Sequence, residues 1–181
     1  MSLSNKSNIL SNDDLKRINS WINKLKEMKP LDKKQRVKKA KSKLKLNYKK
    51  IGAGCNRIVY DINHRYVLKV AITKRGIKNN EIEFNIYKHC PDQLREHLCP
   101  VKEIGYGWII MDKMSKKVPK SSYYNRKRTE MFNEFKNNGI EAKDLQWSNL
   151  ALSKSGKITV FDYGNFNMPS KNIIYKKKRK K

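Results

Sequence analysis

Residues 144–149 read Asp-Leu-Gln-Trp-Ser-Asn, and residues 162–164 read Asp-Tyr-Gly. The chain between them reads as two short strands, NLALS at 149–153 and KITVFDYG at 157–164, joined by a turn at 154–156. The two segments therefore carry two carboxylates, Asp144 and Asp162, and the carboxamide of Asn149 next to the hairpin, with a second carboxamide at Gln146. Carboxylate and carboxamide oxygens are hard donors of the kind that Mg²⁺ and phosphoryl chemistry require.

The charge of the 181-residue chain is strongly positive and unevenly distributed. Lys and Arg number 43 against 16 Asp and Glu, which gives a formal net charge of +27. Residues 1–50 hold +12 of this excess and residues 171–181 hold +7. Such basic arms are attracted to nucleic acid, anionic lipid surfaces or acidic proteins, and this attraction weakens as salt is added.

Length, cysteines and hydropathy narrow the class of protein further. A chain of this length predicts one domain with a hydrophobic core. Three cysteines without an N-terminal apolar segment predict a reducing intracellular compartment, cytoplasmic or nuclear. No apolar run approaches the roughly 18 residues of a membrane-spanning helix, so we expect no transmembrane segment.

Residues 1–48 read as two helices. Apolar residues recur at helical spacing after a cap at 11–14 and stop at Pro30, and the positions are Leu15, Ile18, Ile22 and Leu25. The next run, KKQRVKKAKSKLKL at 33–46, has a narrow apolar stripe and lysines elsewhere. It is either a solvated charged helix or a polyanion-binding one, and the sequence leaves open whether the arm packs on the rest of the chain.

The middle of the chain alternates between strands and helices. Residues 49–71 are β-branched and aromatic with a turn-like segment at 61–63, which predicts an antiparallel hairpin or meander. Residues 77–90 and 121–138 return to helical spacing, and 106–114 read as a short apolar strand. In the second helix we expect Met131, Phe132 and Phe135 to point inward and Asn138-Gly139 to cap the C-terminus.

This order of elements, together with the two quoted segments, resembles the protein kinase-like superfamily, in the form of a minimal Ser/Thr protein kinase-like domain of viral or prophage type. The family's catalytic loop reads H-R-D-x-x-x-x-N and its metal-binding segment reads D-F-G. Asp144 and Asn149 have the same offset, and Asp162 opens the second segment. The resemblance implies that Asp144 serves the acceptor hydroxyl while Asn149 and Asp162 hold Mg²⁺.

The resemblance extends to residues that would bind ATP. Gly52-Ala-Gly54, followed by Val59, is similar to the glycine-rich loop that covers the phosphates. The third glycine of that loop is replaced by Arg57, so the fit is partial and the arginine is a candidate contact for phosphate or substrate. Lys69, in YVLKVA, resembles the lysine that pairs with the α- and β-phosphates.

A buried lysine requires an anionic partner, and the helix at 77–90 offers two. Glu83 shares a helical stripe with Ile86, Tyr87 and Cys90, whereas Glu81 lies on another face. We therefore expect Glu83 to pair with Lys69, with Glu81 as the alternative.

The segment WIIMDKM at 108–114 resembles the strand that leads into the kinase hinge. The resemblance implies that backbone groups from Asp112 to Met114 hydrogen-bond the adenine, with Met111 behind it. An ordinary core strand is the other interpretation of this segment.

Departures from the family pattern define the expected fold. Ala142 and Lys143 replace the His and Arg of the catalytic loop, and 17 residues follow Gly164, too few for an activation segment or a peptide-binding platform. We expect an α+β protein kinase-like fold with an N-terminal antiparallel-sheet lobe and a much reduced C-terminal helical lobe. The expected divisions are an arm at 1–48, lobes at 49–112 and 113–168, and a tail at 169–181.

Two functions from different classes follow. The first is an ATP- and Mg²⁺-dependent phosphotransferase whose acceptor is a protein or a small molecule, with basic arms that bind nucleic acid or another polyanion. The alternative is a kinase fold without turnover that binds nucleic acid or belongs to a virion. A zinc site at His89, Cys90, His97 and Cys99 is a weaker alternative, because their spacing lacks a CxxC pair.

Overall fold

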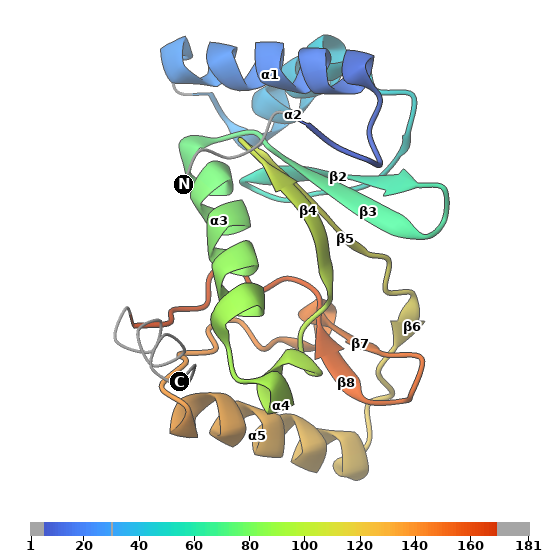
Figure 1. The fold of residues 1–181 in the computed structure, drawn as a ribbon, viewed down its shortest axis with the longest axis vertical. Coiled ribbons are helices and arrows are strands. Elements are labelled where there is room, and N and C mark those ends of the chain that lie inside the picture. The colour runs from blue at the N-terminus through green and yellow to red at the C-terminus, as the bar shows by residue number, and fades with distance from the viewer. Residues whose placement is uncertain (1–5, 30, 170–181) are drawn as a thin grey trace, which may run out of the picture. The chain divides into compact units, whose positions relative to one another are not determined.

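The computed structural model describes residues 6–29 and 31–169, and the chain forms two compact units (Figure 1). The first unit takes residues 1–81 and 101–113, and the second takes 82–100 and 114–181. Apart from Pro169, the predicted basic tail lies outside the described residues. No helix in the described part of the chain is long and apolar enough to cross a membrane.

The first unit contains two N-terminal helices, the start of a third and a five-stranded sheet. Its elements are α1 (Asn12–Glu27), α2 (Lys33–Leu44), the first half of α3 (Lys74–His89), β1 (Lys49–Ala53), β2 (Arg57–Ile62), β3 (Tyr66–Ala71), β4 (Val101–Gly105) and β5 (Trp108–Asp112). All neighbouring strands are antiparallel, in the order β1-β2-β3-β5-β4. The β2–β3 turn falls at 63–65, two residues later than predicted, where Asn63 and His64 adopt positive φ.

The caps of α1 and α2 follow from their sequences. The Ser11 side chain accepts from the Asp14 N–H, and the predicted apolar positions of α1 are all buried. Asp32 and Gln35 form a reciprocal capping box at the start of α2, and Lys45 ends it in the left-handed conformation. The two helices predicted for the N-terminal arm are therefore present.

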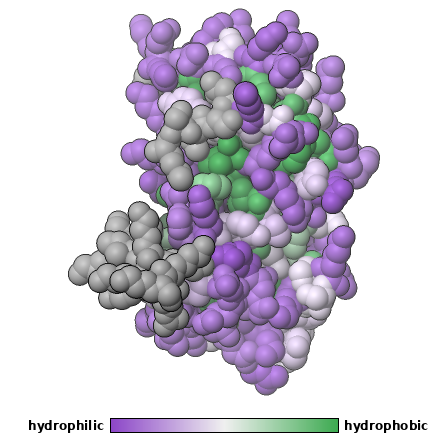
Figure 2. All heavy atoms as spheres, viewed as in Figure 1, coloured by the Kyte–Doolittle hydropathy of each residue, from purple (hydrophilic) through white to green (hydrophobic). Residues whose placement is uncertain are grey.

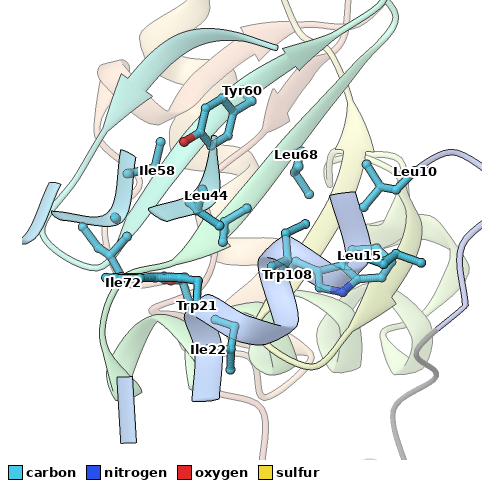
Figure 3. Close-up of a cluster of buried hydrophobic side chains, with 14 of the residues drawn as sticks. Leu10, Leu15, Trp21, Ile22, Leu44, Ile58, Tyr60, Leu68, Ile72 and Trp108 are labelled. Carbon is cyan, nitrogen blue, oxygen red and sulfur yellow. The ribbon is translucent and has the colours of Figure 1, made fainter. Parts of the chain in front are cut away.

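Helices α1 and α2 share one hydrophobic core with a single face of the sheet (Figure 3). Trp21 is 1% exposed, and its indole Nε1 donates a 2.8 Å hydrogen bond to the Ala71 carbonyl. The strand residues of this core are Ile58, Tyr60, Ile62, Leu68, Val70, Ala71, Trp108 and Ile110. The solvent-facing side of these two helices is mostly hydrophilic in the view of Figure 2, because their apolar side chains point toward the core.

The second unit is built around one long helix and a small sheet. Its elements are the second half of α3, α4 (Asp92–Arg95), β6 (Lys116–Lys117), α5 (Ser122–Asn137), a 3-10 turn (Trp147–Asn149), β7 (Leu150–Leu152) and β8 (Ile158–Val160). The predicted hairpin is confirmed as β7–β8, with Gly156 at φ +80° in its turn.

The inward face of α5 was predicted in part. Met131 and Phe135 are buried, and Gly139 follows the helix at φ +72° as expected of a C-terminal cap. The prediction for Phe132 is wrong, because its side chain is 43% exposed. Consecutive residues of a helix point about 100° apart, and on α5, whose buried residues are Met131 and Phe135, this step takes Phe132 outside the buried stripe. Phe135 instead contacts Phe166 edge to face.

The fold class predicted from the sequence is confirmed. An antiparallel five-stranded sheet carries one long helix between β3 and β4, and β5 leads into a second unit that contains α5, residues 144–149 and the β7–β8 hairpin. This is an α+β arrangement with an antiparallel sheet and a small number of helices, as the sequence predicts.

An ion pair in the first unit joins the buried carboxylate of Asp61 to the half-buried side chain of Lys113. Lys113 Nζ lies 2.7 Å from Asp61 Oδ2 and, as the main cause, lowers the pKa of that carboxyl below its ordinary value. Because the folded-state pKa is depressed, the pair stabilises the fold above the ordinary carboxyl pKa and its contribution is lost as pH falls through the folded-state value.

We therefore expect the stability difference between wild type and Asp61→Asn to shrink as pH is lowered below about 4. Urea midpoints measured for both proteins between pH 2 and pH 7 test this. A difference that is independent of pH would show that the charge of Asp61 does not contribute.

Candidate functional site

The register of the sheet places three predicted ATP-binding residues side by side. Gly52 pairs with Val59 across β1 and β2, and Val59 pairs with Lys69 across β2 and β3. Residues directly opposite in adjacent antiparallel strands share one face of the sheet. This face is opposite the one that packs under α1 and α2. Lys69 is 4% exposed on it.

Met111 lies on the same face as Lys69. Val67 pairs with Met111 while Lys69 pairs with Ile109, so these four side chains alternate with the core residues on the other side. Met111 is fully buried, and Asp112 and Met114 are half-buried. The backbone N–H of Lys113 donates to the Arg65 carbonyl at 2.9 Å and is therefore engaged within the unit. Adenine recognition from Asp112 to Met114 stays a prediction.

The glycines of the predicted loop are not required by the fold itself. A Cβ added at Gly54 would meet no atom within 4 Å, and one at Gly52 would make only an ordinary 3.8 Å contact with Val59. Neither glycine has the left-handed φ that excludes other residues. The space that a side chain would fill is therefore open, as is required where a ligand phosphate approaches a backbone. Phosphate binding by this loop stays a prediction.

Arg57, at the place of the third glycine, is buried rather than extended into solvent. Its Nη1 donates to Asn80 Oδ1 on α3 at 3.1 Å. The arginine is therefore held against the helix of its own unit, and its expected contact with phosphate or substrate stays a prediction.

In the second unit, Asp144 and Asn149 are brought together as the sequence predicts. Asp144 is exposed and adopts φ +66°, a left-handed conformation that is uncommon outside glycine. The side-chain Nδ2 of Asn149 donates to the Asp144 backbone carbonyl at 3.0 Å. The Oδ1 of Asn149, the atom of the amide that can bind a cation, accepts a long 3.5 Å hydrogen bond from the Ser148 hydroxyl.

Sequence reasoning missed Asn165, which orients the carboxylate of Asp144. Asn165 Nδ2 donates to Asp144 Oδ2 at 2.7 Å. The sequence feature that could have identified Asn165 as a site residue is its position directly after Asp162-Tyr-Gly164. The loop is held from the other side by α5, because the Arg128 guanidinium lies 5.0 Å from the Trp147 ring centroid.

Glu83 is fully buried, whereas Glu81 is half-buried. The Tyr163 backbone N–H donates to Glu83 Oε1 at 3.2 Å, and the Tyr163 hydroxyl donates to the Cys99 carbonyl at 2.8 Å. Burial raises the pKa of Tyr163 well above its ordinary value, and the charge of Glu83 raises it further. Glu83 is thus tied to the segment that begins at Asp162, while its pairing with Lys69 stays a prediction.

The candidate metal ligands are Asn149 and Asp162, both half-buried. Amide and carboxylate oxygens match the hard donors that Mg²⁺ prefers, so the donor set fits this ion. The described residues contain no group of three or more His, Cys, Asp or Glu that could hold a metal. Of the residues of the zinc alternative, His97 is engaged elsewhere: its Nδ1 lies 3.2 Å from the Ile158 carbonyl oxygen, and its Nε2 lies 3.3 Å from Glu134.

Comparison with solved structures gives neighbours of low sequence identity. No protein-family model matches the chain, and no curated protein matches it. Solved structures of WbdD, a bifunctional kinase-methyltransferase, are similar. The complex of WbdD with the kinase inhibitor LY294002 is 14% identical, with a TM-score of 0.49, over 64% of this chain and 32% of that one. Monomeric WbdD is 12% identical, with a TM-score of 0.45, over 67% and 35%. The chain thus spans about a third of the length of these neighbours.

Proposed function

We propose that the protein is an ATP- and Mg²⁺-dependent phosphotransferase that transfers the γ-phosphate of ATP to a hydroxyl acceptor. The observation that carries this proposal is the backbone of Asp144, a non-glycine residue in the left-handed conformation whose exposed carboxylate is oriented by Asn165. Such strained conformations persist where the surrounding structure enforces them, and they cluster at functional sites.

Each residue has a distinct part in the proposed reaction. Asp144 accepts or orients the proton of the acceptor hydroxyl as its oxygen attacks the γ-phosphorus and the bond to the bridging oxygen of the β-phosphate breaks. Lys69 contacts the α- and β-phosphates, with Glu83 as its carboxylate partner and Glu81 as the alternative. Most of the acceleration in phosphoryl transfer comes from positioning and charge neutralisation, which this small set can supply.

The remaining predicted residues bind the nucleotide and its cation. Gly52, Gly54 and Val59 cover the phosphates, and the backbone from Asp112 to Met114 recognises the adenine, with Met111 behind it. Asn149 and Asp162 hold Mg²⁺, which when bound neutralises charge on the phosphates. The acceptor is a protein Ser or Thr by family resemblance, with a small-molecule hydroxyl as the alternative.

The proposal is tested by Mg²⁺-dependent ATP binding and turnover. We expect ATP with Mg²⁺ to raise the melting temperature of the wild type, and labelled phosphate to move to the protein itself or to a basic general substrate. Asp162→Ala should lose the Mg²⁺-dependent part of the thermal shift and the transfer.

Asp92→Ala is the control for this experiment, because it removes an 83% exposed carboxylate of the same unit. Absence of both the shift and the transfer from the wild type, at low and at moderate salt, would contradict the proposal.

A second candidate function, favoured by α2, is the binding of nucleic acid or another polyanion. The sequence has no Asp or Glu between residues 33 and 60. The lysines of α2 are exposed, and within the described part of the chain none pairs with a carboxylate. A cationic surface of this kind binds phosphate polymers with strong salt dependence. This cationic surface is compatible with two functions. It would bring an enzyme to a polyanion, or it would be the binding surface of a kinase fold without turnover, including a protein of a virion.

A further inference from the structure

The tip of the glycine loop, Cys55 and Asn56, is hydrogen-bonded to α2 and to the two residues that precede α3. On one side, Arg36 of α2 donates from Nη1 to the Cys55 carbonyl at 2.9 Å. The second nitrogen of the same guanidinium, Nη2, donates to the Leu31 carbonyl just before α2. One planar side chain therefore joins the start of α2 to the loop tip, a geometry that the fixed fork of arginine makes possible.

Residues 72 and 73, directly before α3, hold Asn56 through backbone and side chain. The Ile72 N–H donates to the Asn56 carbonyl at 2.8 Å, and the Thr73 hydroxyl donates to Asn56 Oδ1 at 2.9 Å. The same hydroxyl accepts from the Gly76 N–H at 2.9 Å. Asn56, Thr73 and Gly76 thus form one continuous chain of hydrogen bonds from the loop to the helix.

Gly76 is the residue that permits this approach. A Cβ at this position would lie 2.2 Å from the Asn56 carbonyl oxygen and 3.2 Å from the Ala71 Cα. Both neighbours are backbone atoms, which cannot move aside as a flexible side chain could. Only glycine allows α3 to pass so close to the loop.

We infer that Arg36 and Gly76 are positioning residues that hold the glycine loop in a single conformation from opposite sides. Within the loop, Gly54 N–H donates to the Arg57 carbonyl at 2.9 Å, so the turn is closed before any ligand arrives. A loop ordered in advance does not lose that freedom when it binds. The consequence for ATP affinity rests on the proposed function, whereas the fixed loop conformation does not.

The test is amide hydrogen exchange of the full chain, which needs no ligand. We expect Arg36→Ala to speed exchange at Gly54 and Ile72 by about threefold to tenfold, the equivalent of losing one hydrogen bond of ordinary strength, because the Arg36–Cys55 bond is exposed. Arg36→Lys keeps the charge but not the fork, so it should give an intermediate rate. Lys38→Ala removes an exposed charge of the same helix and should leave both amides unchanged.

A second arm measures Mg²⁺-ATP affinity by titration. Arg36→Ala should weaken binding by about threefold to tenfold with little change in melting temperature, and Gly76→Ala should weaken it at least as much. Unchanged exchange in Arg36→Ala, or equal acceleration in Lys38→Ala, would overturn the inference. If the wild type binds no Mg²⁺-ATP, the proposed function fails while the exchange result still decides whether Arg36 holds the loop.

Discussion

Asp144→Asn is expected to reduce phosphoryl transfer by about 10²- to 10⁴-fold while leaving Mg²⁺-ATP binding in place, because a carboxylate that accepts or orients a proton contributes on this scale. The choice of asparagine follows from the backbone. Residue 144 has φ +66°, and asparagine tolerates this conformation better than other side chains that lack charge. Its amide oxygen can still accept from Asn165, so the loop should keep its shape.

The measurement pairs labelled-phosphate transfer with the thermal shift produced by Mg²⁺-ATP. Glu141→Gln is the matched control, because it neutralises an exposed acid three residues earlier in the same segment. Normal transfer by Asp144→Asn would remove Asp144 from the mechanism. Loss of transfer in both variants would point to charge in the segment at large rather than to one carboxylate.

Trp21→Ala is expected to destabilise the protein by about 3–5 kcal/mol, the range for removing a large buried aromatic side chain. Trp21 is 1% exposed in the core formed by α1, α2 and the sheet, and its indole nitrogen donates to the Ala71 carbonyl. Urea unfolding followed by circular dichroism measures the change. Asn23→Ala, at an exposed position of the same helix, should change stability by no more than about 0.5 kcal/mol.

Trp21→Phe separates packing from hydrogen bonding at this position. Phenylalanine keeps most of the buried area and leaves the Ala71 carbonyl without its indole donor, so a loss of about 1–3 kcal/mol is expected. If Trp21→Ala costs no more than the exposed control, α1 does not pack on the sheet as described.

The position of Trp21 also decides how the two candidate functions can be separated. Deleting residues 1–48 would remove α1 and α2 from the hydrophobic core and expose one face of the sheet. Loss of activity would then report unfolding rather than loss of a polyanion-binding arm. Substitution of exposed lysines on α2, which leaves Ala40 and Leu44 buried, separates binding from folding.

Local sequence signals were sufficient to predict most elements of the fold. The cap at Ser11, the stripe of α1 and the β7–β8 hairpin depend on neighbours within a few residues. The burial of α2 could not be predicted, because its narrow stripe of Ala40 and Leu44 is sufficient only when a sheet face lies beneath it. Phe132 was misassigned since apolar character alone does not fix the helical phase.

The candidate site was predictable where spacing along the chain determines it. Asp144 and Asn149 meet because they belong to one short loop. The hydrogen bond between Asn165 and Asp144 joins residues 21 positions apart, and neither residue type indicates from the sequence that it forms. The anchoring of the glycine loop by Arg36 depends on the packing of α2, so the sequence contained no local signal for it.

The division of the sheet into two faces should give a mutational scan a period of two. In β2 and β3, Ile58, Tyr60, Leu68 and Val70 face the core shared with α1 and α2, whereas Val59 and Lys69 alternate with them on the opposite face. Substitutions at the first set should lower the amount of folded protein in cells. Substitutions at the second set should lower activity while they leave abundance nearer normal. The ratio of activity to abundance would therefore alternate along each strand, close to normal at core-facing positions and low at the positions between them.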